Sequence, residues 1–506
     1  MTSSQRIIVN TAAQYTRTII NVCLSLYSTR LILAALGQSD YGIFNVVGGV
    51  VAMLSFITGA LVTTTQRYLS FYYGAKQEDK VYSIFGNSIL LHLLIGLSLV
   101  FILSVGARWI THSYLNIEDS RDDAAMIVYF ASLLMLFLSF FTAPYRALFI
   151  ARENIVYISI VDVLDGIFRV ILAIWLTHIS YDRLITYSCL LPCINIFNLL
   201  AFGLYAASHF KECHWVRLKE WDSAYIKQLS GFAGWTIYST GCIIARTQGI
   251  AILLNRVLGT IANAAYGVAL HVTSAIHFVA QSITTAINPQ IMKAEGGGDR
   301  ARMIVLAENA SKYATLLIAM VAIPIIAEMD SILHWWLTDV PEGANMFCRF
   351  VLAASVCDQL TIGLGSANQA IGKIRAYSLV VNTIKVLTLP AAWLCLKLYG
   401  NTIVVMWCYL GFECLCAATR LPFLKITAGI SILHFIVHAI LPVIFPCLIM
   451  SAVSWCFVSL NSIPYRFVFT LLISSIVGGI VIWFCALTRQ ERTEARNMLL
   501  YKFHRI

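Results

Sequence analysis

Apolar stretches of about 20 residues follow one another along almost the whole chain. An α-helix of this length crosses the ~30 Å hydrocarbon core of a bilayer. Hydrophobic residues make up 59% of the 506 residues and charged residues 12%, and the mean hydropathy is +0.78. These values lie well outside the range of soluble domains. The sequence therefore predicts an all-α polytopic membrane protein.

Fourteen stretches fit a transmembrane window. Their approximate ranges are 7–35, 42–66, 82–106, 124–148, 154–178, 184–208, 230–254, 258–289, 304–333, 348–371, 376–396, 402–419, 432–458 and 467–487. The longest connection, 210–227, has room only for an amphipathic surface helix that carries Trp215 and Trp221. The first stretch is too long for a signal peptide, so we expect the N-terminus to be retained.

Positive charges between the stretches predict the orientation of the chain. If the N-terminus and every second loop face the cytoplasm, 22 Lys and Arg residues lie on that side and 7 on the other. This asymmetry follows the positive-inside rule, and an odd number of helices would scramble it. The sequence thus predicts fourteen helices with both termini in the cytoplasm.

A pattern in residues 36–74 returns about 222 to 225 residues later. Both copies contain Leu-Gly, then Tyr-Gly, then Thr-Thr before a closing glycine. An offset of six helices predicts two lobes of the same orientation, with a binding site between them near mid-membrane. The expected organisation is an N-lobe at 1–215, a C-lobe at 222–430, two extra helices at 431–488 and a basic cytoplasmic tail at 489–506.

Ionisable side chains interrupt the predicted spans. They are Arg17, Arg30, Asp162, Asp165, Arg169, Arg246, Lys312, Asp358, Lys385 and Glu413. A charge at the bilayer centre costs roughly 2.5 to 3.5 kcal/mol, so these groups should face a watery cavity or one another. Six of the ten are cations, which indicates a basic chamber and an anionic cargo.

Polar residues recur at helical spacing in the first predicted helix, where Gln14, Arg17 and Asn21 share one face. The eighth predicted helix repeats this pattern with His271 and Gln281. Hydrogen bonds between helices would explain the uncharged members equally well. For Arg17, and for Arg246 on the seventh helix, the cavity interpretation is favoured.

Two interpretations stay open for the remaining charges. Asp165 and Arg169, and also Glu308 and Lys312, are four residues apart and could form packing pairs. Buried carboxylates also bind coupling ions, and the candidates for H⁺ or Na⁺ are Asp162, Asp165, Asp358 and Glu413. Lys385 has no acidic neighbour on its own helix, so it joins the cavity candidates.

Motifs for catalysis, metals and nucleotides are missing from the sequence. The chain has no H-E-x-x-H and no G-x-S-x-G, and Gly372-Lys373 lacks the rest of a phosphate loop. The 14 cysteines include no C-x-x-C pair. We expect a transporter rather than an enzyme, without a metal or any other cofactor and without a nucleic-acid partner.

Three short segments resemble the polysaccharide transport proteins called Wzx flippases, which belong to one superfamily with the MATE exporters and the lipid II flippase MurJ. They are Leu-Gly-Gln-Ser-Asp-Tyr-Gly-Ile-Phe at 36–44, Ala-Pro-Tyr-Arg-Ala-Leu-Phe-Ile-Ala-Arg-Glu at 143–153 and Ala-Ile-Asn-Pro-Gln-Ile at 286–291. The resemblance implies two six-helix lobes in a V, alternating access, and a cargo of undecaprenyl-pyrophosphate that carries a sugar repeat unit. Arg17 and Arg246 match the cations of the flippase branch on helices 1 and 7.

The expected function is therefore a flippase that moves this glycolipid to the periplasmic leaflet for O-antigen (lipopolysaccharide), capsule or exopolysaccharide biosynthesis. Expected substrate-binding residues are Arg17, Arg246, Lys385, Lys312, Asn21, Gln14, Gln281 and His271. We expect a monomer that works with membrane lipids and with polysaccharide polymerase machinery. A cation-coupled exporter of small organic compounds is the alternative. A membrane-embedded ligase or polymerase would need a larger outer loop.

Overall fold

The computed structural model describes residues 3–52, 54–114, 121–213, 222–337, 340–459 and 465–493. In these ranges every regular element is helical. The predicted surface helix with Trp215 and Trp221, and most of the basic tail, lie outside the described residues. The all-α fold is confirmed.

The chain forms two compact units, each described here by itself. The N-unit is Ile8–Ile237, and the C-unit is Tyr238–Ile506 together with the N-terminal residues up to Ile7. The N-unit contains α1 (Ser3–Ala52), α2 (Ser55–Gly74), α3 (Glu78–Val105), η1 (Trp109–Tyr114), α4 (Asp122–Ala151), α5 (Ile155–Leu176), α6 (Arg183–His209), η3 (Lys211–Cys213) and the start of α7 (Ser223–Gly296). The predicted lobe boundaries stay a prediction.

The C-unit contains the rest of α7 and a series of shorter and longer helices. These are α8 (Arg300–Ala327), α9 (Met329–Trp336), α10 (Ala344–Gln359), α11 (Ile362–Ile371), α12 (Ile374–Tyr377), η5 (Ser378–Asn382), α13 (Thr383–Tyr399), α14 (Thr402–Ala428), α15 (Ile432–Phe435), η6 (Ile436–Ile440), α16 (Leu441–Val458), α17 (Arg466–Val481) and η7 (Ile482–Ala486).

Long apolar helices dominate both units. Nine of the described helices are long and apolar enough to cross a membrane, and α10 with α11, which meet at a 45° bend, form a tenth candidate. Large side chains such as Phe101, Ile102 and Val105 on α3 are 63 to 74% exposed, as expected for a face that contacts lipid. The multi-pass character is thus confirmed, while the count of fourteen stays a prediction.

Two elements hold more than one predicted span. Gly37 breaks α1 with φ 77° and ψ 173°, a backbone conformation open essentially only to glycine, so the first predicted helix ends there. The 74 residues of α7 would measure about 110 Å as one straight helix. The first candidate span within α7 ends at Leu254.

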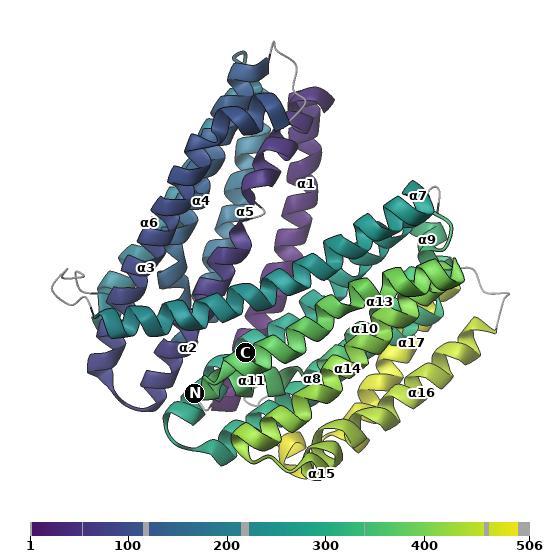
Figure 1. Cartoon of the computed structure of the whole chain (residues 1–506). Helices are drawn as coiled ribbons and strands as arrows, with labels where there is room; N and C mark the ends of the chain where they lie inside the picture. The colour runs from purple at the N-terminus through teal and green to yellow at the C-terminus, as the bar shows by residue number, and fades with distance from the viewer. Residues whose placement is uncertain are drawn as a thin grey trace, which may run out of the picture. The chain divides into compact units, whose positions relative to one another are not determined.

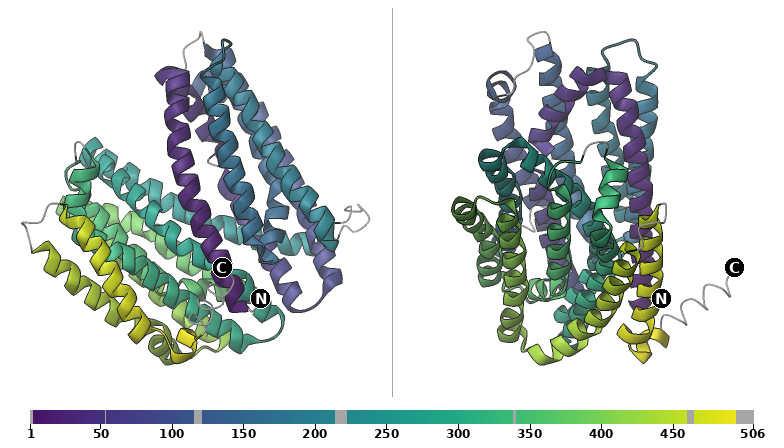
Figure 2. Two further views of the ribbon diagram at one scale, coloured as in Figure 1. Left: turned by 180° about the vertical axis from the view of Figure 1, so that it is seen from behind. Right: turned by 90° about the vertical axis from the view of Figure 1, so that its right-hand side faces the viewer.

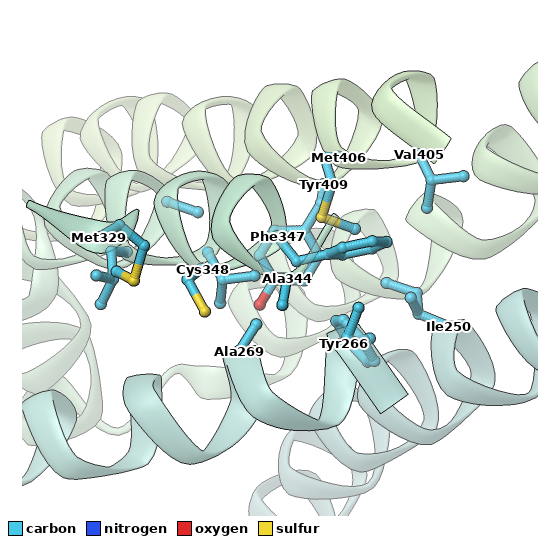
Figure 3. Close-up of a cluster of buried hydrophobic side chains, with 14 of the residues drawn as sticks. Ile250, Tyr266, Ala269, Met329, Ala344, Phe347, Cys348, Val405, Met406 and Tyr409 are labelled. Atoms are coloured by element: carbon cyan, nitrogen blue, oxygen red, sulfur yellow. The ribbon is translucent and has the colours of Figure 1, made fainter. Parts of the chain in front are cut away.

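In the N-unit, α4 packs against α2, α3 and α6, and Figures 1 and 2 show these helices running lengthwise beside one another. In the C-unit, buried side chains from α7, α10 and α14 meet in one core, among them Tyr266, Phe347 and Tyr409 (Figure 3). This core holds the three helices that carry most of the buried charges described below.

Close helix contacts fix the remaining elements of the C-unit. A Cβ atom on Gly363 of α11 would lie 2.0 Å from the carbonyl oxygen of Ala307 on α8, so only glycine fits there. The Gly363 amide donates to Ser311 Oγ at 3.0 Å. The helices α16 and α17 also pack against α8, and Arg466 of α17 pairs with the buried Glu328 at 2.9 Å.

Candidate functional site

Five charged side chains meet inside the C-unit, and we call them the C-cluster. Arg246 of α7 pairs with Glu413 of α14. Lys385 Nζ of α13 lies 2.8 Å from Glu413 Oε1 and 3.3 Å from Asp358 Oδ1 at the end of α10. Arg420 Nη2, two turns beyond Glu413 on the same face of α14, donates to Asp358 Oδ1 at 2.6 Å.

The C-cluster is buried among apolar helices. Its three cationic side chains are 6 to 8% exposed, and Glu413 is 3% exposed. The Arg246 guanidinium lies over the Tyr409 ring, 4.6 Å from its centroid, which adds a cation–π contact. The membrane charges are therefore satisfied largely by one another.

The break between α10 and α11 is part of this site. A bend of a membrane helix frees backbone carbonyls that lipid cannot satisfy. Arg420 Nη1 donates to the carbonyl oxygen of Asp358 at 3.0 Å and to Thr361 Oγ1 at 3.3 Å. One guanidinium thus binds both the carboxylate of Asp358 and the opened backbone beside it.

The C-cluster carries more positive than negative charge. Three cations face two carboxylates, a net charge of +1 among the described residues of the cluster. The Nε atoms of Arg246 and Arg420 are buried and have no hydrogen-bond partner in the described part of the chain. Glu413 Oε1 also lacks a hydrogen bond within these described residues, although it lies near Lys385 Nζ. Buried polar atoms are normally paired, and the surplus positive charge gives the cluster capacity for an anion.

A second group of charges, the N-cluster, lies in the N-unit. Asp162 of α5 accepts from Arg17 Nη1 of α1 at 2.5 Å and from both Nη atoms of Arg146 of α4, at 2.8 and 2.6 Å. One turn along α5, Asp165 accepts from Arg169 Nε at 2.6 Å and from Asn198 Nδ2 of α6 at 2.7 Å. The N-cluster also has three guanidinium groups for two carboxylates.

The structure brings together many of the residues that the sequence singled out. Arg246, Lys385, Asp358 and Glu413 share the C-cluster, and Arg17 contacts Asp162 in the N-cluster. The pair between Asp165 and Arg169 forms as the helical spacing predicts. Lys385 has no acidic neighbour on its own helix, and it pairs with Asp358 of α10 and Glu413 of α14.

The predicted pair of Glu308 and Lys312 does not form. Lys312 Nζ instead donates to both carboxylate oxygens of Glu491, at 2.7 and 2.9 Å, and Tyr313 OH donates to the same group at 2.5 Å. Glu308 pairs with His434 Nδ1 at 3.0 Å. Helix spacing placed the two residues correctly on one face of α8, but neighbouring segments supply closer partners for each.

The uncharged candidates have varied surroundings. Gln14 is buried on α1, and Asn21 lines a cavity described below. His271 and Gln281 are exposed on α7, and their side chains make no hydrogen bond within the described residues. The side chain of Arg30 lies outside the described set. The substrate-binding roles of all these residues stay predictions.

Two further arginines belong to the clusters. Arg146 and Arg420 are among the 22 Lys and Arg residues counted on the cytoplasmic side from the sequence, but they lie on α4 and α14 and bind Asp162 and Asp358. The spacing of seven between Glu413 and Arg420 signals a shared helix face. No comparable local signal connects Arg146 with Asp162, because the two lie on different helices.

Metal ligands are not assembled in the described part of the chain, where no group of three or more His, Cys, Asp or Glu side chains could hold an ion. The fourteen cysteines are free. The described charged groups of both clusters are held by ion pairs.

Comparison with known proteins by sequence finds a remote relative. No family model matches the chain. The uncharacterized membrane protein EpsK of Bacillus subtilis is 22% identical over 324 residues. This alignment covers 62% of this chain and 62% of EpsK, less than two thirds of either protein.

Solved structures of transporters share the fold. A mutant MATE transporter matches with a TM-score of 0.75 at 12% identity, over 85% of this chain and 97% of that chain. A MOP superfamily transporter from Pyrococcus furiosus, described as having a binding pocket of reverse polarity, gives 0.72 at 11%, over 85% and 96%. The MATE transporter ClbM in complex with Rb⁺ gives 0.70 at 15%, over 86% and 96%. The chain thus has the MATE transporter fold.

Proposed function

We propose that this protein is a flippase that moves undecaprenyl-pyrophosphate-linked oligosaccharide repeat units from the cytoplasmic to the periplasmic leaflet by alternating access. The observation that carries the proposal is the C-cluster, in which three buried cations face two carboxylates. The MATE transporter fold supports transport in general, and the surplus positive charge favours an anionic cargo.

The pyrophosphate group would supply the negative charge that the C-cluster lacks. An uncompensated charge among apolar helices is costly, and a bound anion would remove that cost. The planar guanidinium fork binds two phosphate oxygens at once through charge-assisted hydrogen bonds. In this proposal the unpaired Nε atoms of Arg246 and Arg420 turn to the pyrophosphate, Lys385 assists, and the lipid tail stays in the bilayer.

Arg17 has the corresponding role in the N-unit. It shares Asp162 with Arg146, so a second anion-binding group is available once either arginine exchanges its partner. The proposal places the protein in a bacterial inner membrane with both termini in the cytoplasm, as a monomer that delivers its cargo to polysaccharide polymerase machinery. Protons or sodium ions at the cluster carboxylates would supply the coupling.

A cation-coupled exporter of small organic compounds is the second candidate. Asp162, Asp165, Asp358 and Glu413 provide carboxylates inside helices of the kind such an exporter needs, and one structural neighbour was solved with Rb⁺. Each of these carboxylates is already held by an arginine or lysine. A cationic cargo would have to displace these partners, which makes the exporter the weaker proposal.

The two candidate functions predict different phenotypes in cells. A strain without this gene should accumulate the lipid-linked repeat unit and lose the surface polysaccharide. Arg246→Gln should fail to restore export, and Arg246→Lys should restore it partly because the charge returns without the fork. Arg349→Gln, which removes an exposed ion pair with Asp330, is the matched control and should restore export fully.

The amount of each variant in the membrane is measured beside export. Normal export by Arg246→Gln, or a loss that only follows a lower protein level, would contradict the proposed binding role. A deletion strain with unchanged surface polysaccharide but greater sensitivity to organic cations would identify the exporter instead.

A further inference from the structure

The N-unit contains a polar cavity that borders the N-cluster, which contributes Asp162, Asp165 and Arg169 to its wall. It has a volume of about 440 Å³ and lies among α1, α5 and α6, with Asn21, Ser28, Tyr41, Asp165, Arg169 and Tyr187 in its wall. Sites for small molecules in proteins typically measure roughly 300 to 1,000 Å³. The cavity is therefore large enough for a ligand of more than a few atoms.

Glycine shapes one side of this cavity. A Cβ atom on Gly166 of α5 would lie 3.0 Å from Asn21 Oδ1 and 3.0 Å from Leu24 Cδ1, both on α1. Asn21 Oδ1 is buried and has no hydrogen-bond partner within the described residues. A buried amide oxygen of this kind needs a donor, and the cavity is where a ligand could supply one.

The charges in and next to the cavity wall disfavour a cationic ligand. Asp162 is bound by two arginines, and Asp165 is bound by Arg169 and by Asn198. An incoming cation would meet neutralised carboxylates and a net positive charge. A ligand that forms hydrogen bonds without bringing positive charge fits this wall better.

Aromatic rings complete the wall. Phe44 and Tyr187 both line the cavity and meet edge to face, with ring centroids 5.2 Å apart. Apolar ring faces beside amide, hydroxyl and carboxylate groups suit a sugar, because a pyranose has apolar C–H faces and a rim of hydroxyl donors and acceptors. Hydroxyl groups would also donate to the spare lone pairs of Asp165 and to Asn21.

We infer that this cavity binds a sugar residue of the cargo. The inference rests on the proposed function, in which the sugar arrives linked to undecaprenyl-pyrophosphate. The C-cluster then recognises the pyrophosphate that every cargo of this class shares. The cavity at Asn21 and Tyr187 discriminates among repeat units by their sugars.

Binding of two lipids, one with and one without the sugar, distinguishes pyrophosphate recognition from sugar recognition. The full-length protein in nanodiscs is titrated with sugar-free undecaprenyl pyrophosphate and with the lipid-linked repeat unit extracted from cells that lack this gene. Asn21→Leu and Tyr187→Phe should weaken binding of the glycan-bearing lipid about tenfold and leave the sugar-free lipid unchanged. Arg246→Gln should weaken both. Asn195→Leu, the same change at a residue of α6 outside the cavity wall, should affect neither.

Thermal unfolding of each variant checks that the N-unit remains folded. The sugar site is overturned if Asn21→Leu and Tyr187→Phe weaken both lipids alike or neither, or if the wild type binds the two lipids with equal affinity. In those cases binding of undecaprenyl pyrophosphate, and with it the proposed function, stands. If the wild type binds neither lipid, the proposed function fails together with the sugar site.

Discussion

Lys385 and Glu413 form an ion pair of 2.8 Å in which both side chains are more than nine-tenths buried. Glu413 is at the same time the partner of Arg246. One carboxylate therefore compensates two buried cations. Loss of the carboxylate and loss of one cation should have very different consequences for the fold.

Glu413→Gln should destabilise the protein more than Arg246→Gln. The first change leaves Arg246 without its carboxylate and Lys385 with only Asp358, and breaking a buried pair in this way costs about 3 to 5 kcal/mol. The second leaves Glu413 paired with Lys385 and lowers the net charge of the C-cluster from +1 to zero. Thermal unfolding in detergent measures both variants; equal losses of stability would contradict the shared-carboxylate arrangement.

Gly363→Ala should strongly destabilise the C-unit. Its new Cβ atom would overlap the Ala307 carbonyl oxygen at 2.0 Å, so α8 and α11 must separate, at a cost of about 3 kcal/mol or more. Gly411→Ala on α14 is the matched control, because no atom lies within 4 Å of its new Cβ. The thermal unfolding temperature should fall by several degrees for the first variant and hold or rise for the second.

Lys312→Met should release the segment after η7 from α8. Glu491 holds Lys312 through two hydrogen bonds, and it caps the Thr488 amide at 2.7 Å. Without Lys312, limited trypsin digestion after Arg489 and Arg492 should be several-fold faster. Lys397→Met removes an exposed lysine that lies over Trp393 and should leave the cleavage rate as it is. Equal rates in all three proteins would show that the pair does not hold the segment.

Acid should weaken the N-unit partly through Asp182, which caps α6 and pairs with Arg121. Burial raises the pKa of Asp182, but hydrogen bonds from the Ile185 amide and from Arg121 outweigh it, so the pKa lies below its usual value. The stabilisation is present above the unfolded pKa, about 3.9, and is lost as the pH falls through the lower folded value. Asp182→Asn keeps the cap but should show a smaller fall in unfolding temperature between pH 6 and pH 3. If the unfolding temperature falls equally with pH in the wild type and in Asp182→Asn, Asp182 does not contribute to the acid sensitivity.

Local patterns of the sequence predicted those features of the fold that depend on one segment at a time. Hydropathy located the long apolar helices, and the spacing of four predicted the pair of Asp165 with Arg169. The choice of partners between helices was less accessible. Glu491 rather than Glu308 binds Lys312, since tertiary packing brings a residue far along the chain closer than the neighbour on the helix.

The C-cluster shows the same limit. The sequence identified Arg246, Lys385, Asp358 and Glu413 as charges that face a cavity or one another, but it did not show which of them form pairs. Their pairing follows from the convergence of α7, α10, α13 and α14, and Arg420 joins because a helix break beside Asp358 frees a carbonyl for it. Neither the convergence nor the break can be derived from hydropathy.

Lipid movement by the purified protein tests the central claim most directly. Liposomes that contain the protein and fluorescent undecaprenyl-pyrophosphate-linked saccharide in one leaflet should show its transfer to the other, where an added membrane-impermeant quencher reaches it. Arg246→Gln should slow this transfer at least tenfold, and Arg349→Gln should not. Absence of lipid transfer by the wild type, together with ion-coupled export of an organic cation from the same liposomes, would contradict the flippase and support the exporter.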